Sequence, residues 1–458
     1  MNLKYKSKNG WEVVSNEEKE QISTFCEGYK AFLDNGKTER ECTFEAIKIA
    51  EKNGFKPINS FDKLIAGDKV YINNRDRSIM LAVIGSEKIT SGTNIIAAHI
   101  DSPRIDLKQN PLYEDLDMAF FKTHYYGGIK KYQWTTIPLA LHGVVVKGDG
   151  STIEIKIGED QADPIFCITD LLPHLAQDQM KKTMSEGITG EGLNILIGSN
   201  PNTDEKDKVK GAILTLLNEK YDICEEDFIS AELQLVPSAK ARDLGFDRSM
   251  VAAYGQDDRV CSYAALIGIL EIKSPIKTAI CVLADKEEVG SMGNTGMKSR
   301  FFEDTLAKII SLKEENYNDL LLRETLTNSV CISADVGAAV DPNYKEVQEL
   351  ANAPRLNYGI LMTKYTGSRG KSGSSDASAE LVGRIRKMFN DNDIVWQIGE
   401  LGKVDQGGGG TVAQYIANLN IDTIDCGVPL LSMHSPLEVA GKMDIFMTYK
   451  AYKCFYNI

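Results

Sequence analysis

The order of apolar and polar positions divides the chain into three stretches. In the first hundred residues, two helix-period patterns predict helices over Asn16–Asn35 and Thr38–Lys52. They are followed by a predicted hairpin through VYINN and IMLAVIG and by a short apolar strand, TNIIAAH. This opening stretch therefore reads as mixed helix and strand.

The middle stretch, from about residue 107 to 235, has a different pattern of apolar and polar positions. Segments such as IPLALHGVVVKG and TIEIKIG alternate apolar and polar positions around the turn GDG, which predicts antiparallel strands. The charged run GSNPNTDEKDKVKG is predicted to be a solvated connection.

Beyond Arg242 strands and helices alternate, through SYAALIGILEIK, TAICVLA, SRFFEDTLAKIISL, SVCISAD, DASAELVGRIRKMF, IVWQIG, GTVAQYIANL and IDTIDCGV. Such alternation predicts an α/β fold with a mixed, largely parallel sheet flanked by helices. We expect one α/β domain built from residues 1–106 and 241–458, interrupted by an inserted β-rich domain over residues 107–240.

Composition narrows the class of protein. A chain of 458 residues with 43% hydrophobic and 26% charged residues resembles an ordinary globular protein of two domains. A net charge of -13 argues against a nucleic-acid partner. No run approaches the ~20 apolar residues of a membrane span, and the N-terminus lacks the apolar core of a signal peptide, so we expect a cytoplasmic protein without a membrane partner. The nine cysteines are scattered singly, as buried thiols would be.

Potential metal ligands recur where predicted strands end, and this is where ligands bind in open α/β sheets. Each of these residues alone has an ordinary structural explanation, as a hydrogen-bonded histidine, a helix N-cap or a solvated turn. Their joint occurrence favours a site. The set comprises His99, Asp257, Glu287, Glu288, Asp335 and His434.

The adjacent pair Glu287 and Glu288 raises a question of charge, because two like charges repel unless water or a cation holds them. Imidazole and carboxylate suit zinc, and also manganese or cobalt. Two histidines and three carboxylates could hold two divalent ions, which lower the pKa of a bound water. One glutamate then becomes a ligand and the other accepts the proton. Asp101, two residues after His99, could accept the other N–H of that ring.

Several familiar motifs fail. The GKS of YTGSRGKSGSS lacks the first glycine of a phosphate loop, GSMGNTG lacks dinucleotide-binding spacing, and no GxSxG of serine hydrolases occurs. The run GGGGT at 407–411 could cradle an anion or form a plain connection.

AAHIDSPR, YYGGIKKYQW, GQDDR, DKEEVGS, SADVGAAVDPNY, GSRGKSGSSDASAE and MHSPLE resemble, in order and spacing, the aspartyl aminopeptidase (M18) family of co-catalytic zinc peptidases. The resemblance implies two metal ions and removal of N-terminal residues, including acidic ones in some members. It implies a glutamate general base at Glu287, an orienting acid at Asp101 and a bridging ligand at Asp257. The implied metal ligands are His99, Asp257, Glu288, Asp335 and His434.

The same resemblance extends to assembly and selectivity. It implies a large homo-oligomer, commonly a dodecamer, assembled through the inserted domain. His174 matches a histidine that approaches the active site from a neighbouring subunit, in some descriptions a metal-associated one, and Lys364 matches a lysine that can pair with an acidic substrate side chain. Ala338 and Asp341 stand where acid-selective members carry further histidines.

Three functional hypotheses follow. The first is a cytoplasmic dinuclear metallo-aminopeptidase acting on peptides. The second keeps the metals but acts as an amidohydrolase or deacylase on small N-acyl compounds, which need no free α-amine. The third is an assembly or binding protein with vestigial ligands, which the complete ligand set disfavours.

Overall fold

The structure, a computed structural model, describes residues 3, 5–201 and 207–458. The chain divides into two compact units. The first comprises residues 1–101, 241–433 and 437–458, and the second comprises residues 102–240 with 434–436. Among the described residues, no helix combines the length and apolar character that a membrane crossing requires.

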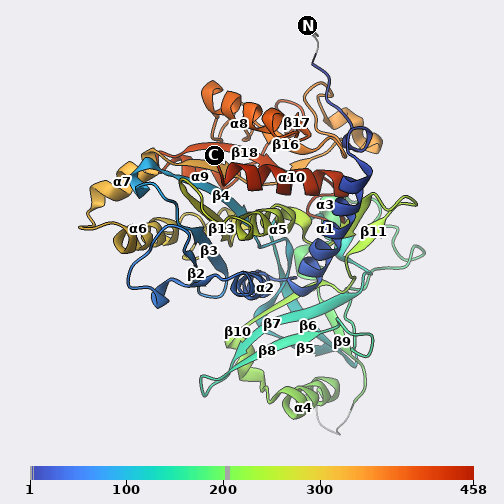
Figure 1. The fold of residues 1–458 in the computed structure, drawn as a ribbon. Helices are drawn as coiled ribbons and strands as arrows, with labels where there is room; N and C mark the ends of the chain where they lie inside the picture. Colours follow the sequence, from blue (N-terminus) through green and yellow to red (C-terminus); the bar gives the residue numbers. More distant parts are fainter. Residues whose placement is uncertain (1–2, 4, 202–206) are drawn as a thin grey trace. The chain divides into compact units, whose positions relative to one another are not determined.

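A nine-stranded mixed sheet forms the centre of the first unit, in the order β1-β2-β3-β13-β4-β14-β18-β16-β17 (Figure 1). Its middle is parallel, as the sequence predicts, and consists of β13 (Thr278–Ala284), β4 (Thr93–His99), β14 (Val330–Ser333) and β18 (Asp422–Gly427). Antiparallel neighbours flank this middle, namely β3 (Ser78–Val83) and β16 (Ile360–Thr363). The remaining strands are β1 (Lys56–Pro57), β2 (Lys69–Asn74) and β17 (Trp396–Ile398).

Helices cover both faces of this sheet. Successive strand residues point to opposite sides, and the central strands are apolar at both sets of positions, so both faces must be buried. In β4, Ile96 and Ala98 pack into one hydrophobic cluster, and Ile95 and Ala97 into another. The first cluster includes α1 (Asn16–Asn35), α2 (Glu39–Lys52), α5 (Gln256–Leu270), α8 (Ala379–Asp391) and α10 (Lys442–Phe455). The second includes α6 (Phe301–Lys313), α7 (Asp319–Thr327) and α9 (Ala413–Ala417).

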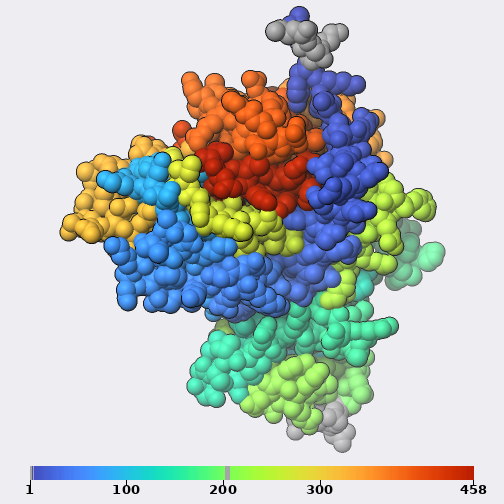
Figure 2. All heavy atoms as spheres, viewed as in Figure 1, coloured from blue at the N-terminus to red at the C-terminus, as the bar shows by residue number. Residues whose placement is uncertain are grey.

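The first two helices begin where the sequence predicts. Ser15 and Thr38 each accept the backbone N–H three residues on, and a glutamate at that position returns the bond, so both helices start with a capping box. Helix α1 lies beside α10, from the other end of the chain (Figures 1 and 2). There Phe25 packs against Phe446 and Tyr449, with ring centroids 5.8 and 4.6 Å apart.

A second, five-stranded sheet in this unit was not predicted from the sequence. It runs in the order β11 (Arg242–Leu244), β12 (Met250–Ala253), β20 (Glu438–Gly441), β19 (Pro429–Leu431) and β15 (Gly337–Ala338). Its strands have two to four residues each. Runs this short are not long enough to display a period-two pattern.

The second unit is built on a six-stranded antiparallel sheet, as the alternating pattern predicts. Its order is β8 (Thr152–Ile157), β7 (Leu139–Val146), β10 (Ala231–Pro237), β5 (Arg104–Asp115), β6 (Met118–Tyr126) and β9 (Ile195–Gly198). A short helix, α3 (Met184–Gly187), lies in the connection before β9.

The predicted solvated connection in this unit is wrong at its C-terminal end. Residues 202–206 of it lie outside the described residues, but Lys208 already begins helix α4 (Lys208–Tyr221). The Glu114 carboxylate accepts the N–H groups of Val209 and Lys210, both at 2.8 Å, and the Val209 side chain is buried. The charged run therefore includes a helix start whose free N–H groups a distant carboxylate satisfies.

Candidate metal centre

Three adjacent strands of the nine-stranded sheet end at the same level. In the parallel register, Ala284 of β13 pairs with His99 of β4, and Ser333 of β14 pairs with Ala97 of β4. The residues that follow these strands therefore emerge at one edge of the sheet. Asp335 and the glutamate pair at 287–288 both arrive there from separate parts of the sequence.

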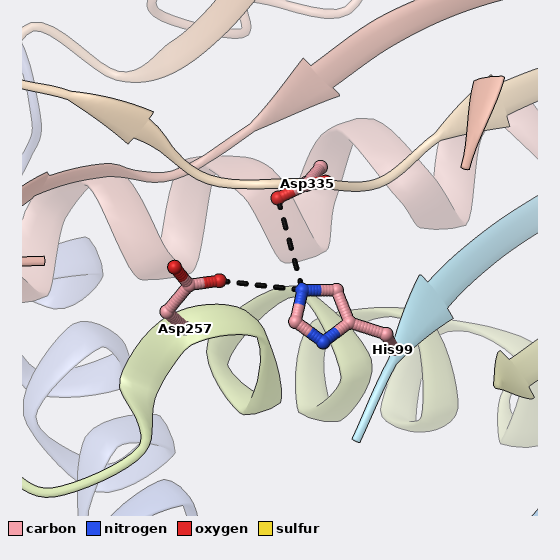
Figure 3. A group of neighbouring side chains, drawn as sticks. All are labelled: His99, Asp257 and Asp335. Carbon is pink, nitrogen blue, oxygen red and sulfur yellow. Dashed lines mark ion pairs between the residues drawn. The ribbon is translucent and has the colours of Figure 1, made fainter. Parts of the chain in front are cut away.

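His99 is the buried centre of this edge. Its Nε2 lies 3.3 Å from Oδ1 of Asp257, at the start of α5, and 3.9 Å from Oδ1 of Asp335, after β14 (Figure 3). Both carboxylates approach the same ring nitrogen from different elements, as the sticks in Figure 3 show. The sequence-based grouping of these three residues thus corresponds to one cluster in space.

The other ring nitrogen of His99 has partners of its own. Nδ1 lies 3.0 Å from the main-chain oxygen of Asp101 and 3.3 Å from its carboxylate Oδ1. Because both are acceptors, Nδ1 carries a proton, and Nε2 is the ring nitrogen that faces the carboxylates and that would bind a metal ion there. The main-chain oxygen is a partner that the sequence could not reveal.

The Asp101 carboxylate also fixes the turn that carries the glutamate pair. Its Oδ1 accepts the N–H of Glu287 at 3.1 Å, and its Oδ2 accepts the N–H of Glu288 at 3.2 Å. The turn is a short 3-10 segment, Glu287–Val289, flanked by Lys286 with φ 67° and Gly290 with φ 85°. One buried side chain therefore contacts both His99 and the turn.

Burial and crowding shape the charges of this cluster. Burial, followed by the nearby charge of Asp258, raises the pKa of Asp335 well above its usual value. Burial opposes a charge on His99, but hydrogen bonds with Asp101 and Asp257 outweigh it and raise the pKa of the ring. Several carboxylates thus crowd around one imidazole, an arrangement that a bound cation stabilises.

The donor set fits a zinc ion. Donors at about 2.0–2.2 Å from a tetrahedral zinc lie about 3.4 Å from one another. The three candidate donor atoms, Nε2 of His99 and one oxygen each of Asp257 and Asp335, all lie within 4.8 Å of one another. One imidazole and two carboxylates are also ligands that zinc, manganese and cobalt accept.

Two predicted site residues belong to the second unit. His434 has φ 65°, and its Nδ1 lies 2.8 Å from the main-chain oxygen of Gly128, so this ring too has one nitrogen engaged by an acceptor. His174 is exposed in the connection between β8 and α3. The roles of both histidines stay predictions.

Lys364 follows β16 in the first unit and already has an anionic partner. Its Nζ lies 2.5 Å from Oδ1 of Asp376, whose Oδ2 is 2.8 Å from Nζ of Lys371. The glycine run is tied to the same loop, because Gly367 donates its N–H to the carbonyl oxygen of Gly409. A Cβ on Gly408 would lie 2.2 Å from the Gly367 oxygen, so close backbone packing explains that glycine.

Comparison with known proteins identifies the family. The model of the aminopeptidase I zinc metalloprotease (M18) family matches residues 32–456. The chain belongs to the M18 family. Relatives within this family are similar over nearly their whole length: a probable M18 family aminopeptidase 1 of Clostridium acetobutylicum is 53% identical over 456 residues, which is 98% of either chain.

Solved M18 structures share the fold. The crystal structure of an M18 aminopeptidase from Thermotoga maritima superposes with a TM-score of 0.96 at 46% identity, covering 99% of this chain and 100% of that one. A dodecamer of the Saccharomyces cerevisiae aminopeptidase mApe1 shares the fold at 19% identity, with a TM-score of 0.77 and coverage of 95% and 97%. This M18 chain is a metallo-aminopeptidase.

Proposed function

We propose that this chain is a dinuclear metal-dependent aminopeptidase that removes N-terminal residues from peptides with Glu287 as general base. The observation that carries the proposal is the convergence of His99, Asp257 and Asp335 next to a turn that presents two glutamates. The proposed ligands of two zinc ions, or of manganese or cobalt, are His99, Asp257 as the bridge, Glu288, Asp335 and His434.

The different exposure of Asp101 and Glu287 supports the different roles proposed for them. Asp101 is fully buried and its oxygens accept two backbone N–H groups, so it serves to position its neighbours. Glu287 is partly exposed on the turn, where a substrate can reach it. Zinc bound at this centre would polarise the scissile carbonyl and activate a water molecule. Glu287 accepts the proton of that water and delivers it to the leaving amine.

The test is Glu287→Gln, with the exposed Glu315→Gln as a matched control. Loss of a general base lowers kcat by roughly 10²–10⁴-fold, while zinc content and the unfolding transition should stay as in the wild type. The assay uses chromogenic aminoacyl substrates with chelated protein and each metal added back. Full activity of Glu287→Gln would contradict the assignment of Glu287 as general base.

A free α-amine separates the aminopeptidase from a deacylase. A peptide and its N-acetylated form are compared with the same enzyme and metal. We expect cleavage of the free peptide only, because the proposed site anchors the amine. Cleavage of both forms at similar rates would favour the deacylase.

We further propose that Lys364 contacts the substrate side chain and that Asp376 limits its attraction for acidic residues. The lysine is neutralised within the chain by a carboxylate that it shares with Lys371. Asp376→Asn should therefore raise kcat/KM for N-terminal Glu relative to Leu, whereas Lys364→Ala should not. An unchanged ratio in Asp376→Asn would count against this subsite.

We propose that the second unit mediates self-association into a large homo-oligomer, with the related dodecamer as precedent. Support comes from large apolar side chains that are exposed along residues 165–184 around His174, among them Leu171, Leu175 and Met180. Leu175→Asp should shift sedimentation toward smaller species, and the exposed Lys182→Ala should not. An unchanged mass for Leu175→Asp would exclude this surface.

A cytoplasmic location is also a proposal. All nine cysteines are described, and each is a free thiol, six of them buried. Unpaired thiols suit a reducing compartment.

A further inference from the structure

A buried glutamate outside the proposed ligand set contacts the backbone of the centre. Glu438, the first residue of β20, is 0% exposed. Glutamate is almost never fully buried unless its carboxylate is paired. Here Oε2 of Glu438 accepts the backbone N–H of Asp257 at 2.9 Å.

Asp257 needs such an acceptor because α5 does not begin as a regular helix. Asp257 and Asp258 have φ and ψ of -82° and 108°, and of -114° and 29°, neither of which is helical. N–H groups in the first turn of a helix have no carbonyl partner within the helix. A buried N–H without a partner is costly, so the acceptor also determines where the backbone of Asp257 settles.

The residue before Asp257 is attached to the same strand. Gln256 donates from Nε2 to the main-chain oxygen of Glu438 at 2.7 Å and to that of Val251 at 3.2 Å. Its Oε1 accepts the O–H of Tyr29 at 3.1 Å. Two consecutive residues, Gln256 and Asp257, are thus bonded to one residue of β20, once to its main chain and once to its side chain.

We propose that Glu438 is a positioning residue of the metal centre, which fixes the backbone of Asp257 and so directs its carboxylate toward Nε2 of His99. The inference rests on the proposed function in that it takes Asp257 as a metal ligand. The proposed action of Glu438 is indirect, because the group its carboxylate accepts is the backbone N–H of Asp257. Its length matters more than its charge, because what Asp257 requires is an acceptor at a fixed place.

Two substitutions separate length from charge. Glu438→Gln keeps the length and an oxygen acceptor but removes the charge. Glu438→Asp keeps the charge but withdraws the acceptor by one carbon, about 1.5 Å. Asp444→Asn is the matched control, because Asp444 is equally buried and accepts the N–H groups of Asn357 and Gly359 at 2.6 and 2.7 Å, neither of which is a proposed ligand.

The readout is zinc affinity of the full-length, metal-stripped protein, measured by competition with a chromogenic zinc chelator, together with the number of zinc ions bound. Disturbing a partner of a ligand typically weakens metal binding by about 10–100-fold, and we expect this loss for Glu438→Asp. For Glu438→Gln, where a neutral acceptor replaces a charged one, we expect at most about a fivefold loss. Asp444→Asn should bind zinc as the wild type does.

The inference is overturned if Glu438→Asp binds zinc as tightly as Glu438→Gln, or if Asp444→Asn loses as much affinity as Glu438→Asp. Should Glu438→Asp not fold, Tyr29→Phe is the milder probe. It loosens only Gln256 and should weaken zinc binding by about 2–5-fold, and an unchanged affinity contradicts the inference. A wild-type protein that binds no zinc would instead refute the proposed function itself.

Discussion

The carboxylate of Asp101 should be needed chiefly for the turn at residues 287–289, and Asp101→Asn tests this. The substitution replaces one of two acceptor oxygens by an NH₂ group. In the native protein these oxygens accept the N–H groups of Glu287 and Glu288 at 3.1 and 3.2 Å. After substitution, one of the two N–H groups faces another donor.

The expected cost follows from that count. One hydrogen bond to a charged group contributes about 1.5–3 kcal/mol, and both partners here are buried or partly buried. We therefore expect the free energy of unfolding to fall by about 1.5–3 kcal/mol. Because a displacement of about 1 Å at a reacting group can cost 10²-fold in rate, kcat should fall by at least tenfold.

The tautomer of His99 should survive the same substitution. Its Nδ1 is 3.0 Å from the main-chain oxygen of Asp101, which the substitution leaves in place. Imidazole ¹⁵N chemical shifts of the zinc-loaded protein, in which only five histidines occur, report which ring nitrogen of His99 keeps its proton.

The assays are urea unfolding of chelated protein, steady-state kinetics of zinc-loaded protein and the ¹⁵N spectrum. Asp444→Asn should lose similar stability without losing kcat, because its carboxylate also accepts two backbone N–H groups. The reasoning is refuted if Asp101→Asn is as stable as the wild type with kcat within about twofold. It is equally refuted if the His99 tautomer changes while stability does not.

Three further expectations concern metal, pH and packing. Chelation should lower the unfolding midpoint, and zinc at a hundred times its Kd should restore about 2.7 kcal/mol, as followed by calorimetry; an unchanged midpoint would argue against a zinc centre. Burial raises the pKa of Asp425 from 3.8 to about 6. Between these pH values the folded state binds more protons than the unfolded state. The free energy of unfolding therefore falls as pH rises from 3.8 to about 6, by up to about 3 kcal/mol. Asp425→Asn should flatten the fall in urea midpoint between these pH values, and an unchanged slope would contradict it. A Cβ on Gly427 would lie 1.9 Å from the Asp335 carbonyl oxygen. Gly427→Ala should therefore lower the free energy of unfolding by about 1–3 kcal/mol and weaken zinc binding. Normal zinc affinity in that variant would contradict the packing argument.

The sequence predicted the sheet edge well because each element that reaches it is local. The strands before His99 and Glu287 contain continuous apolar runs, and the strand before Asp335 is apolar except for Ser333, a composition typical of buried parallel strands. Once these strands are neighbours in register, their ends must coincide. The proposed ligands that follow strands were therefore recognisable as candidates without knowing any side-chain geometry.

What fixes Asp257 could not be predicted in that way. Its N–H is accepted by Glu438, 181 positions away in the sequence, on a four-residue strand. Nothing in the pattern around Glu438 marks it as buried or places β20 beside β12. A side chain that positions a proposed ligand leaves no periodic signal, because its contact is with one backbone atom rather than with a face of an element.

The glutamate pair illustrates the same division. Two adjacent like charges after a strand indicate that water or a cation must stabilise them, and this can be recognised from neighbouring residues alone. Successive residues of a strand point in opposite directions, so a pair serving one site requires a turn. The two N–H groups of this turn need acceptors, and the carboxylate of Asp101, 186 positions away in the sequence, provides them. The pair was thus detectable from its charges, whereas its geometry depends on a residue whose spacing from His99 suggested a different, single role.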